Sequence, residues 1–458
     1  MSQTMTKEIH EENKMGVMPV GKLLFSMSIP MMISMLVQAL YNIVDSIFVA
    51  QISENALTAV SLANPLQMLM IAIGAGTGVG VNALLSRSLG EKNFEKASDV
   101  AKNGVFLALM SSVVFVVIGL FVAKPFLHAQ TNDVEIINYG VEYLSIVCCF
   151  SFGIFAQFVY ERILQATGRT MHTMITQLVG AIINLILDPI LIFGLLGMPA
   201  LGVRGAAAAT VIGQISAGVT AYFMNVYANR DVNVSMKGFR PSVEIIQQIY
   251  KIGVPSIIMQ SIGSIMIFCL NKILIMFSTT ATAVFGVYFK LQGFIFMPIF
   301  GMNNGLVPIV AYNFGARRKD RMMGTYKLAL FSAIGIMLVG VIMFEIFPKQ
   351  LFLLFGASEY MLGMGVPALR IIAFHFPIAA FCIVTGSVFQ AVGKAVYSMI
   401  NSICRQLVVL LLAAYILAQF GEVNYVWFAF LIAEGVSMLL TAVFFKKVYK
   451  EVIKPLEE

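Results

Sequence analysis

Apolar segments long enough to cross a lipid bilayer recur along the whole chain. An α-helix rises about 1.5 Å per residue, so a helix that crosses about 30 Å of hydrocarbon needs roughly 20 residues. The pattern predicts twelve such helices, six in each half, and therefore an all-α polytopic membrane protein. They are expected near residues 24–50, 57–82, 103–123, 138–161, 171–195, 205–228, 252–277, 281–312, 326–347, 368–391, 397–419 and 425–445.

The two halves are related by an internal repeat. A shift of 225 positions aligns Pro30 with Pro255, Gly76 with Gly301, Gly80 with Gly305, Gly90 with Gly315, and two Gln-Ala-x-Gly segments at 165–168 and 390–393. Coincidence in an apolar sequence accounts poorly for these matches at one offset. Because each half holds an even number of helices, both begin on the same side, which predicts two parallel six-helix bundles around a central cavity. A channel needs no such duplication, so the repeat favours a carrier.

Polar stretches divide the chain, and the basic residues in them orient it. We expect an N-terminal tail, an N-lobe, a linker, a C-lobe and a C-terminal tail at 1–22, 23–228, 229–251, 252–445 and 446–458. Of the 30 Lys and Arg residues, 23 fall on the side of both termini. Cytoplasmic loops hold the excess of basic residues, so a multi-pass protein of the plasma membrane with both termini in the cytoplasm is predicted.

Composition and motifs exclude several classes of protein. The chain is 59% hydrophobic and 12% charged, whereas soluble domains are about 25% charged. The five cysteines lie in apolar runs without metal-ligand spacing, and no hydrolase, nucleotide-binding or metalloprotease motif is present. The net charge of +7 resides in short loops, not on a basic face with aromatic residues. We therefore expect no enzyme, no cofactor and no nucleic-acid partner, and transport driven by an ion gradient.

Ionisable residues inside the spans are candidates for function, because a charge in lipid is costly unless it faces water or a partner. Asp45 in the first span belongs to a polar stripe with Ser34, Gln38, Tyr41 and Asn42 at spacings of three and four residues. Such a stripe cannot face lipid. It either joins helices through hydrogen bonds or lines a cavity.

The fifth span carries a second acid, Asp188, with Asn184 one turn before it and Pro189 directly after it. Pro189 leaves the carbonyl of Leu185 without its helical donor, so the helix can bend there. Counted from their span ends, Asp45 and Asp188 reach the same half of the bilayer and are expected to meet in one bundle. Two carboxylates in a dry site do not both ionise cheaply, so the pair is expected to hold a proton or Na⁺.

Glu161 ends the fourth span, with Gln157 and Gln165 one turn to either side. Two interpretations stay open. Its side chain either reaches interfacial water beside Arg162 or serves the mouth of a cavity, where Gln157 would share its face.

The second half lacks counterparts of these acids and carries Lys290, Arg405 and Glu434 inside its spans. Each lies about nine residues from a span end, so a common depth and pairing are expected. A structural salt bridge and a role in substrate handling both remain open for them.

Together these features resemble the multidrug and toxic compound extrusion (MATE) family: the segment 187–194 (LDPILIFG), the repeated Gln-Ala-x-Gly, and Pro30 with Asp45 in the first span. The resemblance covers about residues 22–445. It implies two six-helix bundles in a V. It also implies export of organic cations and amphipathic drugs in exchange for H⁺ or Na⁺. We also expect membrane lipid as a partner and a functional monomer.

The resemblance also assigns residues. Asp45, Asn184, Asp188 and Thr210 match the cation-coupling site of the first lobe, where Na⁺ would bind if it is the ion. Pro30 matches the bend of the first helix. Glu161 resembles the span-four acid of exporters from Gram-positive bacteria.

The predicted function is a secondary active multidrug efflux antiporter that works by alternating access. Gln38, Tyr41, Gln157, Glu161, Lys290 and Arg405 are the candidates for substrate binding or cavity lining. The alternative is a lipid or lipid-linked glycan flippase of the same superfamily, in which Lys290 and Arg405 would bind a phosphate head group. A membrane-embedded enzyme or a passive channel also remains open.

Overall fold

The computed structural model describes residues 12–457. Residues 1–11, which are half of the predicted N-terminal tail at 1–22, and Glu458 lie outside the described part. The helices are α1 (Lys14–Val17), α2 (Val20–Ala50), α3 (Glu54–Gly90), α4 (Phe94–Phe121), α5 (Ala123–His128), α6 (Val134–Cys149), α7 (Phe152–Ala166), α8 (Thr170–Phe193), η1 (Leu195–Gly197), α9 (Val203–Tyr227), α10 (Val243–Leu274), α11 (Thr279–Gly315), α12 (Lys319–Ile346), α13 (Pro348–Leu353), α14 (Glu359–Ala373), α15 (Phe376–Ala391), α16 (Ala395–Ile403), η2 (Cys404–Val409), α17 (Leu410–Ala418), α18 (Val423–Val448), η3 (Tyr449–Ile453) and η4 (Lys454–Glu457).

Twelve spans follow from these helices. Within residues 12–457, ten helices are long and apolar enough to cross a membrane, and two bent pairs, α6–α7 and α14–α15, supply one span each. Large apolar side chains such as Leu120, Phe268 and Phe331 are exposed on the outer faces. Such exposure is expected where lipid is the solvent. The predicted twelve-helix fold class is confirmed.

Two spans differ from their predicted form as single helices at 138–161 and 368–391. The pair α6–α7 bends by 46° and the pair α14–α15 by 49°, at equivalent places in the two repeats. Pro377, at the start of α15, has no N–H and so tolerates a helix start but not a helix interior. At the first bend, the hydroxyl of Ser151 donates to the carbonyl of Ser112 in α4 at 3.4 Å. A hydrophobicity profile does not register such local bonding.

Several helices are longer than their apolar runs. α3 continues to Gly90, and α10 begins at Val243, inside the segment expected to be linker. Helical hydrogen bonds continue past the hydrocarbon boundary, which apolar length alone does not reveal. Matching caps start α3 and α11: Ser53 and Ser278 each accept a backbone N–H three residues ahead at 3.0 Å.

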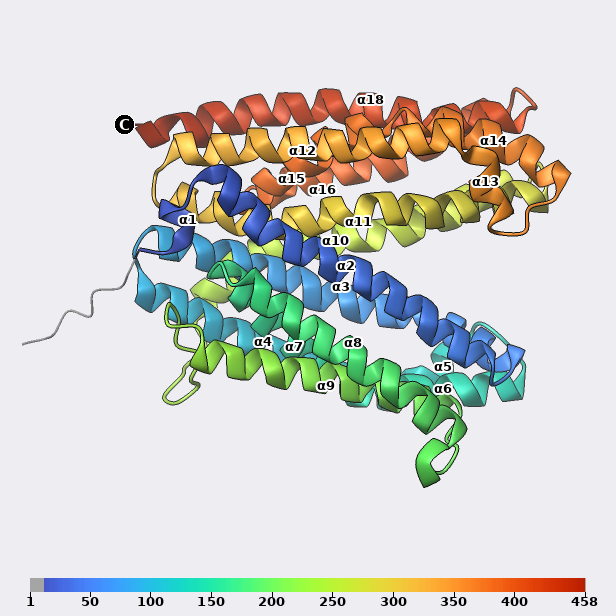
Figure 1. The fold of residues 1–458 in the computed structure, drawn as a ribbon, viewed down its shortest axis with the longest axis horizontal. Helices are drawn as coiled ribbons and strands as arrows, with labels where there is room; N and C mark the ends of the chain where they lie inside the picture. The colour runs from blue at the N-terminus through green and yellow to red at the C-terminus, as the bar shows by residue number, and fades with distance from the viewer. Residues whose placement is uncertain (1–11, 458) are drawn as a thin grey trace, which may run out of the picture.

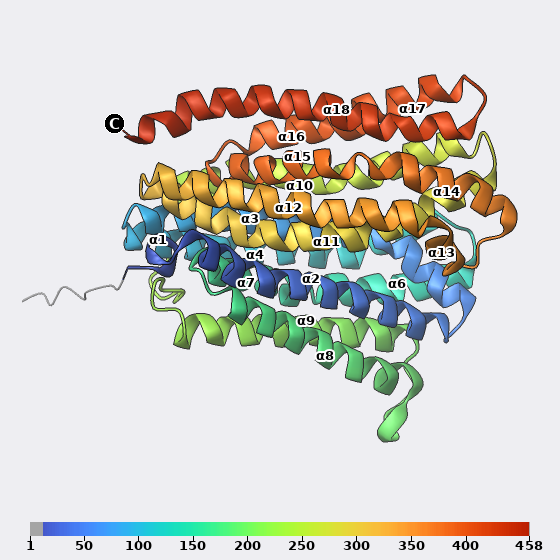
Figure 2. The same ribbon diagram turned by 45° about the horizontal axis from the view of Figure 1, so that its top comes forward.

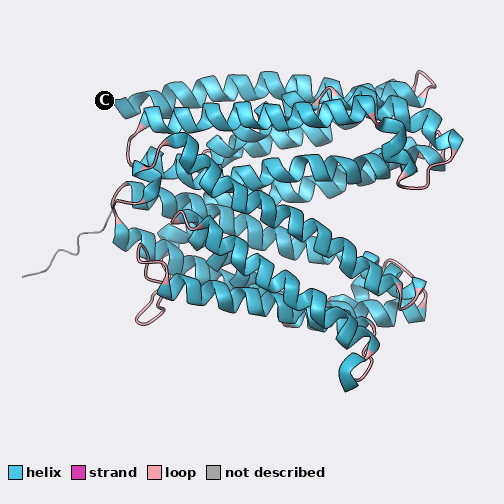
Figure 3. Ribbon diagram, viewed as in Figure 1, coloured by secondary structure: helices cyan, strands magenta, loops and turns pink. Residues whose placement is uncertain are grey.

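The first and second halves of the chain form two groups of helices. In Figure 1 the groups of α2–α9 and α10–α18 lie together at the end that holds both chain ends and diverge toward the other end. Figure 2, after rotation, shows α17 and α18 along one side of the molecule and α8 and α9 along the other. Figure 3 shows that helices make up nearly all of the described chain. We call the end with residues 12 and 457 the termini end.

Repeat-related glycines lie where the lobes touch. A Cβ at Gly76 of α3 would lie 2.5 Å from Ile257 of α10, and one at Gly301 of α11 would lie 2.6 Å from Met32 of α2. Ile257 and Met32 are themselves 225 positions apart. Two further contacts of this kind join Gly90 to Tyr312 and Gly315 to Arg87. The duplicated glycines thus let the backbones of opposite lobes approach closely.

The segment before α2 bridges the two lobes at the termini end. Asn13 donates to the carbonyl of Thr167 in the N-lobe at 3.0 Å. From the C-lobe, Arg321 donates to the carbonyl of Met18 at 2.6 Å and Asn313 to that of Met15 at 3.1 Å. The Met15 side chain is fully buried. The interlobe contact at this end therefore includes α1.

Candidate functional site

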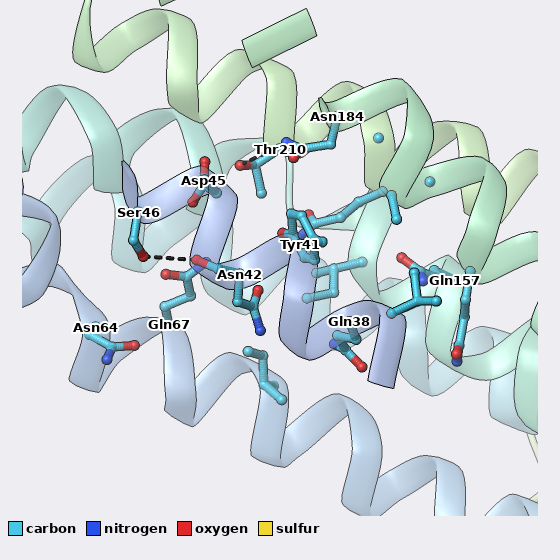
Figure 4. A pocket seen from close by; sticks show the side chains of 18 of the residues that line it. Gln38, Tyr41, Asn42, Asp45, Ser46, Asn64, Gln67, Gln157, Asn184 and Thr210 are labelled. Carbon is cyan, nitrogen blue, oxygen red and sulfur yellow. Dashed lines mark hydrogen bonds between the residues drawn. The ribbon is translucent and has the colours of Figure 1, made fainter. Parts of the chain in front are cut away.

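A cavity of about 360 Å³ lies inside the N-lobe. Helices α2, α3, α6, α7, α8 and α9 supply its walls, and every lining residue belongs to residues 34–214. The predicted stripe on α2 faces into it, and Figure 4 shows Gln38, Tyr41, Asn42 and Asp45 on successive turns. The stripe lines a cavity, which was one of the two interpretations of the sequence.

Asp45 and Asp188 come together in this lobe from α2 and α8. Their carboxyl groups interact directly with one another. Asp188 is fully buried, whereas Asp45 is half-buried and lines the cavity. One oxygen of each, Oδ1, has no hydrogen-bond partner among the described residues. Two facing carboxyl groups with free acceptor oxygens are the arrangement that a proton or a small hard cation satisfies.

Asn184 and Thr210 complete this cluster from α8 and α9. With its amide nitrogen toward Asp188, Asn184 donates to Oδ2 of that residue at 3.0 Å, and its oxygen accepts the backbone N–H of Thr210 at 3.0 Å. Both residues are buried, and Figure 4 shows them facing each other beside Asp45. The structure therefore brings together all four residues of the predicted cation-coupling site.

Glu161 forms a second carboxyl site in the same cavity. It is 3% exposed and accepts from Gln157 at 3.0 Å, Thr176 at 3.0 Å and Gln177 at 2.8 Å. Its neighbour Arg162 turns away. The interpretation of Glu161 as an interfacial side chain is therefore wrong, since the residue lines the cavity.

Arg162 instead connects the lobes. Its Nη1 donates to Gln165 and, across the lobe boundary, to Asn304, each at 2.9 Å. Glu161 is thus left with three neutral donors as its hydrogen-bond partners.

The two carboxyl sites are well separated. Thr176, which binds Glu161, and Asp188 are twelve residues apart on α8. That spacing is about 18 Å of helix. One cavity thus offers negative or polar groups at two depths.

The C-lobe candidates lie elsewhere. Arg405 pairs with Glu434 at 2.7 Å, as expected, but Lys290 is exposed and lies 6.0 Å from the ring centroid of Phe355. The expected pairing of all three charges is wrong for Lys290. Neither Lys290 nor Arg405 lines the cavity.

Both prolines predicted to bend helices lie inside continuous helices, Pro30 in α2 and Pro189 in α8. Ser34 donates to the carbonyl of Pro30 at 3.0 Å. Their role as bends stays a prediction.

Sequence reasoning missed Asn64, Gln67 and Tyr143, which also line the cavity. Tyr143 is 3% exposed and lies beside Asp45. A signal existed for two of them, because Ser61, Asn64 and Gln67 recur every third residue of the second span. Tyr143 lies between Glu142 and Leu144, and this surrounding sequence alone does not indicate that it faces a cavity.

Two bundles of six spans, with a polar cavity inside one of them, define a polytopic membrane transporter. A sequence model of the MatE family matches this chain twice, over residues 30–190 and 255–416. The protein belongs to that family, as the resemblance to MATE transporters implied. The two matches are offset by 225 residues at their starts, which confirms the internal repeat.

Curated relatives and solved structures agree with this assignment. Multidrug export protein MepA of Staphylococcus haemolyticus (strain JCSC1435) is 28% identical over 422 residues, which cover 92% of each chain. MepA of Staphylococcus aureus (strain MRSA252) is 28% identical over 427 residues, with the same coverage. A MOP superfamily transporter from Pyrococcus furiosus superimposes with a TM-score of 0.90 at 28% identity, covering 98% of this chain and 99% of that one. A MATE transporter in an outward-facing conformation gives the same four values.

Proposed function

We propose that this protein is an ion-driven antiporter that exports organic cations and amphipathic drugs in exchange for H⁺ or Na⁺. The observation that carries the proposal is the Asp45–Asp188 pair beside the N-lobe cavity. The names of the staphylococcal relatives, multidrug export proteins, support drugs as the substrate class.

The coupling between ion and drug follows from the two carboxyl sites at different depths of the cavity, the Asp45–Asp188 pair and Glu161. A cation bound between Asp45 and Asp188 removes their mutual repulsion and lets α2 and α8 approach. A cationic drug that binds near Glu161 competes electrostatically for the same negative lobe. Loading one site therefore weakens the other, and a ligand that prefers one arrangement of the bundle shifts the population toward it.

Four oxygen-bearing side chains would surround Na⁺ if it is the coupling ion. Asp45 and Asp188 offer the free carboxylate oxygens and Thr210 adds a hydroxyl oxygen, while Asn184 would add its amide oxygen after the amide turns away from the backbone N–H of Thr210. Oxygen ligands of this kind suit hard cations. For a proton, the two carboxyl groups alone suffice, with the proton shared between them.

Alternating access would move one lobe against the other. With the termini in the cytoplasm, as the basic loops predict, the glycine contacts and α1 close the cytoplasmic side in this structure. The likeness to an outward-facing MATE transporter supports this interpretation. We propose that the monomer in membrane lipid is the working unit, since the cavity lies within one chain.

The flippase alternative is less well supported. It requires Lys290 and Arg405 to converge on one phosphate, but Lys290 lies against Phe355 and Arg405 is neutralised by Glu434.

Dye efflux from proteoliposomes tests the proposal, with pH and Na⁺ gradients imposed separately. We expect efflux under at least one gradient, and its loss in Asp188→Asn. Asp99→Asn is the matched control, since Asp99 lies outside the cavity and 4.0 Å from Lys102. If Asp188→Asn keeps gradient-driven efflux at the rate of the control, the antiport mechanism is wrong.

A further inference from the structure

The C-lobe carries a buried ion pair about one helical turn from the positions that are equivalent to the N-lobe cation site. The 225-residue shift carries Gly180 to Arg405 and Ala209 to Glu434. Gly180 lies on α8 one turn before Asn184, and Ala209 on α9 directly precedes Thr210. The C-lobe therefore places an ion pair between its last two spans, within about one turn of Val409 and Gly435, the equivalents of Asn184 and Thr210.

The pair is buried inside the C-lobe. Nη1 of Arg405 donates to Oε1 of Glu434 at 2.7 Å, and the Glu434 side chain is only 7% exposed. Tyr288 of α11 and His375, just before α15, are both buried. Both lie close enough to the pair to interact with it electrostatically. Cys382 of α15 also faces it. Among these neighbours, Arg405 is the cation that neutralises Glu434.

The pair is incompletely satisfied. Nε of Arg405, Oε2 of Glu434 and the hydroxyl of Tyr288 have no hydrogen-bond partner among residues 12–457. A pair selected only for packing would be expected to use these groups. Oε2 of Glu434 is therefore a buried acceptor that is available to a cation when the guanidinium is absent.

The helix geometry at this position also differs between the lobes. Residues 404–409, which include Arg405, form the π-helical segment η2, whereas the equivalent part of α8 is a regular α-helix. Single π-helical turns insert into α-helices frequently at functional positions. Here the π-helical turn contains the residue that carries the charge.

We propose that the Arg405 guanidinium is a tethered cation that permanently neutralises the carboxylate of Glu434 in the C-lobe. In the N-lobe, the exchangeable cation neutralises the carboxyl pair only transiently. This inference rests on the proposed function for its account of the N-lobe. Arginine stays protonated at every physiological pH and cannot leave, so Glu434 is neutralised throughout the cycle. The C-lobe thereby keeps one packing, and the N-lobe alone responds to H⁺ or Na⁺.

The chain contains its own reporter for the C-lobe. Trp427 is its only tryptophan, is fully buried, and lies on α18 seven residues before Glu434. Seven residues correspond to about 10 Å along the same helix face. Intrinsic tryptophan emission therefore reports on the surroundings of Glu434 without a label.

The experiment follows Trp427 emission of the purified full chain while Na⁺ is added or the pH is lowered. Wild type and Arg405→Lys are expected to show no shift. Arg405→Gln is expected to shift, because Glu434 then recruits an exchangeable cation. Arg405→Gln with Glu434→Gln is expected to lose the shift again. Arg370→Gln is the matched control, because Arg370 pairs with Glu345 at 3.7 Å, outside this cluster.

Three results would overturn the proposal. The first is an emission shift in wild type, and the second is no shift in Arg405→Gln. The third is a shift that persists in the double variant, because it would then come from His375, Tyr288 or Cys382. If Arg405→Gln does not fold, the double variant decides: a folded double variant without an emission shift supports the proposal, and an unfolded or still responsive one contradicts it. Asp188→Asn leaves these emission results unchanged, so they stand apart from the antiport test.

Discussion

Gly76 and Gly301 occupy equivalent positions in the two repeats, and each lies against the first span of the opposite lobe. The two contacts are reciprocal, because Gly76 meets Ile257 and Gly301 meets Met32. This pseudo-symmetric pair gives the lobes a close, two-sided contact toward the termini end.

Gly76→Ala is therefore expected to separate the lobes at that end. The added Cβ would lie 2.5 Å from Ile257, closer than carbon atoms tolerate. Overpacking of this kind costs about 1–3 kcal/mol. Spin labels at the equivalent exposed positions Glu95 and Asp320 should report longer distances. Gly286→Ala is the control, because an added Cβ there meets nothing within 4 Å, and it should leave the distances unchanged. An unchanged distance in Gly76→Ala would mean that this contact does not hold the lobes together.

Arg321→Gln should release the N-terminal segment from the C-lobe. The variant loses the charged donor to the carbonyls of Met18 and Met15. Hydrogen bonds from charged groups contribute about 1.5–3 kcal/mol each, so hydrogen exchange across α1 should accelerate about tenfold or more. Lys327→Gln, an exposed position on the same helix α12, is the control. Equal exchange in the two variants would mean that Arg321 does not hold α1.

The same segment should respond to pH through Lys14. Burial, and then the nearby Arg169 guanidinium, lower the pKa of the Lys14 ammonium. The pKa of Lys14 is lower when α1 is docked than when it is free, so protonation of Lys14 opposes docking. Docking should therefore strengthen as the pH rises from the lowered pKa toward the ordinary value of 10.5. A spin-label distance from exposed Val17 to Lys237 measures this, and Lys14→Gln should abolish the dependence.

Glu161→Gln should weaken the binding of organic cations but not of uncharged drugs. The substitution removes a buried carboxylate whose hydrogen-bond partners Gln157, Thr176 and Gln177 are neutral. A charge-assisted contact of about 1.5–3 kcal/mol corresponds to roughly 10- to 100-fold in affinity. Fluorescence titration with a cationic dye measures the change. Glu345→Gln is the control, because it removes an acid outside the cavity, and it should bind the dye like wild type. Wild-type affinity in Glu161→Gln would mean that the Glu161 carboxylate has no part in binding.

The sequence was sufficient to predict the helices and their duplication, because apolar length and a fixed offset are both one-dimensional signals. The pairing of Asp45 with Asp188 could also be predicted, since each stands on a polar face at a countable depth. The bend at Phe150 could not, because it depends on the contact of Ser151 with α4, which no local pattern encodes. At His375 the sequence does hold a local sign of a helix start, Pro377, which apolar length alone does not reveal.

Some site residues escaped prediction for a similar reason. Tyr143 becomes part of the cavity only through the packing of α6 beside α3 and α9. Lys290 was expected beside Arg405 from its depth alone, but depth does not fix the direction of a side chain around a helix. The direction places Lys290 over Phe355 instead.

The central claim is that one cation held by Asp45 and Asp188 is exchanged for drug. The most direct test adds a cationic dye to purified protein in weak buffer and records the release of H⁺ with an indicator, or of Na⁺ with a radiotracer. Wild type is predicted to release the ion as dye binds, and Asp45→Asn and Asp188→Asn to bind dye with little or no release. Undiminished release from both variants would contradict the account.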